Sequence, residues 1–176
     1  MKEACNLLFR YLAILCVGLG SLFLFYKLLF PPTFYLTTWI LNLFGSVKAF
    51  PSLGFFIYNS SAVYLIGACI AGSAYYLLFI LLFSTPNIPP FRRVKVLLFT
   101  FASLLVLNIL RIVLMTLIAG TIYFDSVHLL FWYFISIVFV IAIWFLAVRI
   151  FNIKKIPVYS DIKFLINQLK SSKRDS

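Results

Sequence analysis

The stretch VKVLLFTFASLLVLNILRIVLMTLIA, residues 94–119, decides the fold. After Lys95 it contains one charged residue, Arg111, and every other side chain is apolar, small or neutral. A helix that crosses the hydrocarbon core of a bilayer needs about 20 predominantly apolar residues. The stretch therefore predicts a membrane-spanning helix that carries a guanidinium in its interior, where a charge is expensive and usually functional.

The rest of the chain has too few polar residues to cover a soluble domain. Of its 176 residues, 64% are hydrophobic and 11% are charged, which places it in the membrane class. The net charge is +11, but the basic residues gather beside apolar runs and in the C-terminal tail. We therefore expect contacts with anionic lipid and no nucleic-acid partner. The three cysteines fit neither a zinc site nor a disulfide framework, and no cofactor or metal is expected.

The apolar runs predict an all-α fold, a polytopic membrane helical bundle with four transmembrane helices. Pro31 and Pro32 are expected to end the first helix, and the segment STPNIPP to end the second. Residues 1–153 would form the transmembrane domain, and residues 154–176 a basic amphipathic tail. The four runs are residues 7–30, 62–83, 94–119 and 127–151.

The basic residues also predict the topology. Most lysines and arginines lie in the loop after the second run and in the tail, so both termini should be cytoplasmic in a multi-pass protein of the cell membrane. Residues 33–50 have a helical apolar stripe and are expected to form a helix in the outer interface. In the tail, Ile162, Leu165, Ile166 and Leu169 predict an amphipathic helix on the cytoplasmic leaflet.

Three uncommon side chains fall in the outer half of this predicted bilayer, on three different helices. Arg111 lies roughly 13 Å below the outer end of its helix, and Cys69 roughly 10 Å inside the second helix, at 1.5 Å per residue. His128, the only histidine, opens the fourth helix. A thiolate is a nucleophile, an imidazole can move its proton, and a guanidinium can stabilise an oxyanion. This set is sufficient for acyl transfer, at a site that faces outside.

Each of these residues also has a simpler explanation. Arg111 would pin helices through backbone carbonyls, Cys69 would pack as a small hydrophobe, and His128 would lie at the interface. Asn108 would hold the guanidinium or hydrogen-bond another helix, and Asp125 would orient the imidazole or lie in water. The small residues around Cys69 would let another helix or an extended peptide approach the sulfur.

Three segments carry a resemblance to a known family. GACIAGS around Cys69, LNILRI with Asn108 and Arg111, and YFDSVHLLFWYF with His128 resemble the exosortase/archaeosortase family. The short length and the tail IPVYSDIKFLI are similar to its small archaeal branch, the pacearchaeosortases. The resemblance covers about residues 58–145. One departure is that the family often has a small polar residue and then glycine directly after the cysteine, whereas Ile70 and Ala71 precede Gly72 here.

The resemblance implies a membrane-embedded cysteine protease or transpeptidase that cleaves C-terminal sorting signals of surface proteins. Cys69 would form a thioester, and a membrane lipid, an amine or water would accept the acyl group. His128 would be the general acid and base and Arg111 the oxyanion stabiliser, although the two roles could be exchanged. The partner would be the sorting-signal segment.

Two non-catalytic alternatives remain at this stage. One is a small transporter or channel subunit with a polar cavity around Arg111 and Asn108, although such proteins more often have internal repeats. The other is a structural subunit that binds a partner helix through the small residues near Cys69.

Overall fold

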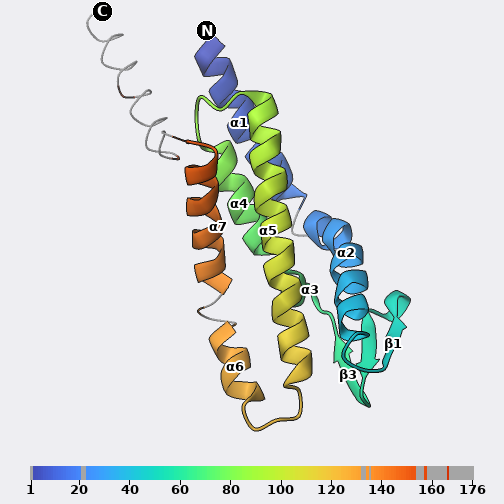
Figure 1. Ribbon diagram of the computed structural model, residues 1–176. Helices are drawn as coiled ribbons and strands as arrows, with labels where there is room; N and C mark the ends of the chain where they lie inside the picture. Colours follow the sequence, from blue (N-terminus) through green and yellow to red (C-terminus); the bar gives the residue numbers. More distant parts are fainter. Residues whose placement is uncertain are drawn as a thin grey trace, which may run out of the picture.

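The computed structural model describes residues 2–20, 23–131, 134, 136–153, 157 and 166. The described part is mostly helical, with one small sheet beside the helices (Figure 1). The helices are α1 (Lys2–Leu19), α2 (Phe23–Leu41), α3 (Gly67–Ile70), α4 (Gly72–Phe83), α5 (Pro90–Leu117), α6 (Phe124–Leu130) and α7 (Ser136–Ile150). The strands are β1 (Val47–Phe50), β2 (Phe55–Tyr58) and β3 (Ser61–Tyr64), and a 3-10 turn spans Pro51–Leu53.

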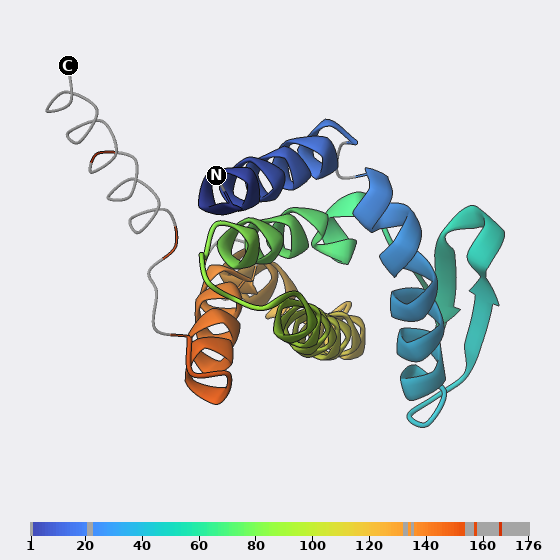
Figure 2. The same cartoon turned by 90° about the horizontal axis from the view of Figure 1, so that it is seen from above.

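Helix α5 is the longest described helix, and it confirms that the stretch at residues 94–119 is helical as far as Leu117. It begins with Pro90 at its first position, where the missing N–H costs nothing. It packs against α2, α4 and α7, which flank it in the view from above (Figure 2). Among the described residues it is the one helix that is long and apolar enough to cross a membrane by itself. The prediction of four such continuous helices is not met.

The second predicted span, residues 62–83, is wrong as a continuous helix. Its first residues form β3, a single turn follows as α3, and α4 begins at Gly72. The hairpin forms because aromatic and β-branched residues flank Asn59 and Ser60, which both have positive φ and make a two-residue turn. The two helices are separated by Ala71, which adopts the left-handed conformation with φ of 58°. The fourth run, residues 127–151, contains the end of α6 and the whole of α7, and residues 132, 133 and 135 between them lie outside the described part of the chain.

The expected end of the first helix at Pro31 and Pro32 is also wrong, and the helix expected at residues 33–50 is present only as far as Leu41. Helix α2 continues through both prolines to Leu41, and the strand β1 follows. Tertiary packing outweighs the lost backbone hydrogen bonds. Phe34 is fully buried, and its ring lies 5.5 Å from that of Phe30 and 6.1 Å from that of Phe56.

The sheet is antiparallel with strand order β1-β2-β3, and it packs against α2. β3 is therefore an edge strand, and Figure 1 shows it as the strand nearest to α5 and α6. At the opposite end of α5, buried Arg10 donates from Nε to the Phe83 carbonyl at 2.8 Å, and Arg93 donates to the Thr85 carbonyl at 3.1 Å. These bonds satisfy carbonyls at the C-terminal end of α4, where a cation is favourable.

Apolar side chains also cover much of the outer surface of the helices. Examples at more than half exposure are Leu12, Leu15, Leu28, Leu98 and Phe145. The predicted amphipathic tail, residues 154–176, lies almost entirely outside the described residues, so this prediction and the domain division remain predictions.

Candidate functional site

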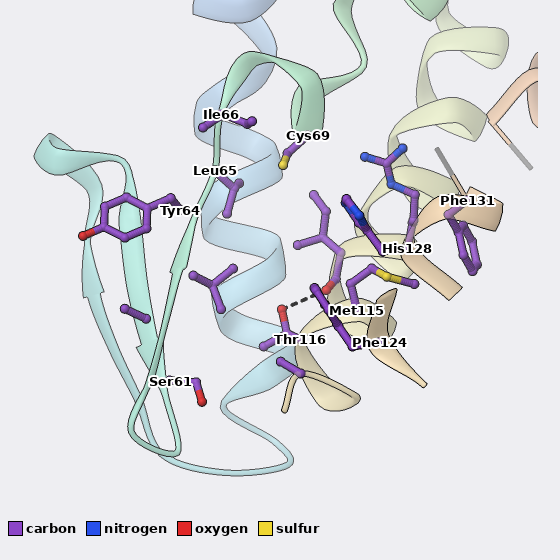
Figure 3. Close-up of a pocket in the computed structure, with 15 residues that line it drawn as sticks. Ser61, Tyr64, Leu65, Ile66, Cys69, Met115, Thr116, Phe124, His128 and Phe131 are labelled. Carbon is purple, nitrogen blue, oxygen red and sulfur yellow. Dashed lines mark hydrogen bonds between the residues drawn. The ribbon is translucent and has the colours of Figure 1, made fainter. Parts of the chain in front are cut away.

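A cavity of about 340 Å³ lies between the sheet edge and the helices α5 and α6. Four elements contribute to its wall: β3 with the two residues after it, α3, the last turns of α5, and α6. Figure 3 shows the side chains of Cys69 and His128 entering this space from different walls. The lining residues used below are Ala62, Tyr64, Ile66, Cys69, Arg111, Met115, Thr116, Phe124, His128 and Phe131.

Cys69 is held in place by its backbone. It belongs to the single turn α3, in which its N–H donates to the Ile66 carbonyl at 2.9 Å. Its own carbonyl accepts a hydrogen bond of 2.7 Å from Nδ2 of Asn108, which reaches across from α5. Asn108 is 3% exposed, so this bond is sheltered from water. The half-buried thiol thus belongs to a residue whose backbone N–H and C=O are both hydrogen-bonded.

Arg111 lies one turn after Asn108 on α5 and is half-buried. Its Nη1 donates to Oγ of Ser136 at 3.1 Å, and that hydroxyl donates to the Phe131 carbonyl at 2.7 Å. The guanidinium is therefore oriented by the first residue of α7. The guanidinium lines the same cavity as the Cys69 thiol.

His128 projects from α6 and is exposed. Its ring is parallel to that of Phe124, with 5.6 Å between centroids and an angle of 7° between planes. The stack limits the rotation of the imidazole on the cavity wall. Asp125 lies in the first turn of α6, is exposed and does not line the cavity. Its orienting role remains a prediction.

The rest of the lining is mostly apolar, and none of the described residues that line the cavity is acidic. A positive charge in an apolar wall favours a group that is negative or becomes negative. Within the described ranges, no group of three or more histidine, cysteine, aspartate or glutamate side chains could hold a metal ion. The available chemistry is that of a thiol, an imidazole and a guanidinium around one space.

The sequence-predicted residues are distributed as follows. Cys69, Arg111 and His128 line the same cavity, although 59 residues separate the first from the last. Of the two roles open to Asn108, the structure has the hydrogen bond to another helix, because its partner is the backbone of Cys69.

Two contributors were missed from the sequence. Ser136 orients Arg111, and its only signal is a hydroxyl within an apolar run. The edge strand β3 forms one wall, and its signal was the aromatic and β-branched residues on both sides of Asn59 and Ser60. In comparisons with protein-family models, with curated proteins and with solved structures, no match to the chain was found.

Proposed function

We propose that the protein is a membrane-embedded cysteine transpeptidase, similar to the exosortase/archaeosortase family, that processes C-terminal sorting signals of surface proteins. The observation that carries the proposal is the common cavity of Cys69, Arg111 and His128. These residues come from three separate elements, and each supplies one of the functions that acyl transfer requires.

The first half of the reaction forms a thioester. His128 takes the proton of the Cys69 thiol, and the sulfur attacks the carbonyl carbon of the scissile peptide bond. The carbonyl oxygen becomes an oxyanion, which Arg111 stabilises in the apolar cavity. His128 then gives its proton to the leaving amine as the C–N bond breaks, and the acyl group remains on sulfur.

The second half releases the acyl group. An amine or a lipid hydroxyl attacks the thioester, and His128 takes the proton of this nucleophile. The C–S bond breaks, the thiolate of Cys69 leaves, and the proton on His128 restores the thiol. The product carries a new amide or ester bond to the acceptor, so the surface protein becomes attached to the membrane.

A membrane location is supported by the apolar outer surface and by the length of α5. Many large apolar side chains of the described helices are exposed, whereas soluble monomers rarely gather such side chains in large exposed patches. Arg93 and Arg111 lie about 27 Å apart along α5 at 1.5 Å per residue, which is close to the hydrocarbon thickness of about 30 Å. With the basic start of α5 at the cytoplasmic face, the cavity would lie near the outer face, with both termini inside.

The proposal is tested with a secreted reporter that ends in a candidate motif, an apolar helix and basic residues. The motif is taken from proteins of the same genome that share such an ending. We expect wild-type protein to shorten the reporter, Cys69→Ala to leave it intact, and Cys16→Ala, which changes an exposed cysteine on α1, to process it normally. Normal processing by Cys69→Ala would overturn the proposal.

A further inference from the structure

The strand β3 has one free edge in the described part of the chain. It pairs with β2 through the register Phe55↔Tyr64 to Tyr58↔Ser61, and no strand adjoins its other side among the described residues. After Tyr64 the chain stays extended through Ile66, which directly precedes the turn that holds Cys69. The free edge of β3 is therefore followed directly by the turn that carries the Cys69 thiol.

The hydrogen-bond pattern determines which backbone groups face this edge. The Leu65 N–H donates to the Gly54 carbonyl at 2.9 Å, so residues 65, 63 and 61 direct their backbone groups toward β2. By the same alternation, Ala62 and Tyr64 direct their N–H and C=O groups away from β2. These groups have no partner strand in the described part of the chain.

The free edge and the nucleophile share one space. Every residue from Ser61 to Ile66 lines the cavity together with Cys69, Arg111 and His128. Across the cavity, Met115 and Phe124 offer apolar surface to side chains. The cavity volume of about 340 Å³ holds only a short part of a polypeptide. The rest of an extended polypeptide must therefore continue along the open side of the cavity.

We propose that the substrate polypeptide binds as a fourth strand on the free edge of β3, with the residues beside the scissile bond in extended conformation. This inference rests on the proposed function and names how its substrate is held. Strand addition uses main-chain hydrogen bonds for affinity and pockets at alternate positions for specificity. From Ala62 to Ile66 the edge spans about 13 Å, which is enough to align several substrate residues before Cys69.

The test uses a peptide that reacts with the thiol of Cys69. The probe is an acetylated pentapeptide built of alanine and valine, with a vinyl sulfone group at its C-terminal end. The thiolate of Cys69 adds to the vinyl carbon that is farther from the sulfone sulfur. A set of variants carries one N-methyl group each, which removes one backbone donor. With full-length wild-type protein, N-methylation at alternate positions should slow the labelling of Cys69 about fivefold, and at the positions between by less than about twofold.

A matched pair of protein variants tests the same edge from the other side. Ala62→Pro removes an N–H from the free edge of β3 without breaking a bond to β2. Ala49→Pro makes the equivalent change on the outer edge of β1, because the Asn59 N–H donates to the Ser46 carbonyl and residue 49 therefore faces away from β2. We expect Ala62→Pro to slow peptide labelling about fivefold and Ala49→Pro to leave it unchanged.

Methyl vinyl sulfone, which has no backbone, separates this inference from the proposed function. It should label Cys69 at the same rate in wild type and in both proline variants. If it labels Cys69 but all N-methylated peptides react equally fast, strand addition is wrong and the nucleophile assignment stands. If neither probe labels Cys69 faster than Cys16, the nucleophile assignment itself fails.

Discussion

Replacing Asn108 with leucine removes the donor that holds the backbone of Cys69 while it keeps a side chain of similar size. The lost bond measures 2.7 Å and is sheltered, because Asn108 is 3% exposed. A buried carbonyl that loses its partner costs about 1–3 kcal/mol. Because α3 is a single turn, little other structure remains to fix the position of the thiol.

The consequence for activity follows from this loss of position. A displacement of a reacting group by about 1 Å can lower the rate about a hundredfold. We therefore expect Asn108→Leu to lower kcat for the reporter by about 10- to 100-fold with little change in KM. The labelling of Cys69 by methyl vinyl sulfone should change less than about threefold, because a small acceptor needs no alignment and Arg111 and His128 remain.

The assay compares reporter processing and thiol labelling in the same purified samples. Thr100→Val is the matched control, because Thr100 is buried on α5 but its hydroxyl bonds within its own helix, to the Val96 carbonyl. It should keep more than half of the wild-type rate. Full activity of a folded Asn108→Leu variant would refute the positioning role.

Three further changes test other contacts. Arg111→Lys should lower kcat for the reporter at least about tenfold, because lysine lacks the planar fork of donors. Ser136→Ala should lower kcat about threefold, because the guanidinium loses its hydrogen-bond partner. Reporter turnover measures both, and a rate equal to that of wild type would contradict the prediction for that variant. Ala71→Gly should raise Tm by about 2 °C, because glycine adopts positive φ without strain, and a fall in Tm would speak against the left-handed conformation. Arg10→Met should lower the free energy of unfolding by about 1–3 kcal/mol in chemical unfolding, because buried carbonyls at the end of α4 lose their donor. Activity per folded molecule should stay unchanged. Loss of that activity would contradict the prediction, because it would show that removing Arg10 disturbs the cavity around Cys69.

The sequence was sufficient for α5 because its signal is local. A long apolar stretch with one guanidinium has few alternatives, and Pro90 sets its start. The position of Arg111 within it was therefore predictable. The meeting of Cys69, Arg111 and His128 was inferred from a shared depth, but the continuous helix that gave Cys69 its depth does not form. The three residues nevertheless line one cavity, because the turn α3 places Cys69 beside α5 and α6.

The remaining elements depend on contacts that local patterns do not contain. Helix α2 passes through two prolines because Phe34 is buried against other aromatic rings, which hydropathy along the chain cannot reveal. The run at residues 62–83 is apolar throughout, so its hydropathy hides the change from strand to helix. That change depends on the pairing of β3 with β2 and on the left-handed conformation of Ala71.

The central claim is that Cys69 carries the acyl group between cleavage and transfer. The most direct measurement is the isolation of reporter covalently bound to the protein during turnover, followed by treatment with neutral hydroxylamine, which cleaves thioesters. We predict an adduct that maps to Cys69 by mass spectrometry, is released by hydroxylamine and is absent in Cys69→Ala. A reporter that is processed at the wild-type rate with no adduct at Cys69, or with an adduct on another residue, would contradict the account.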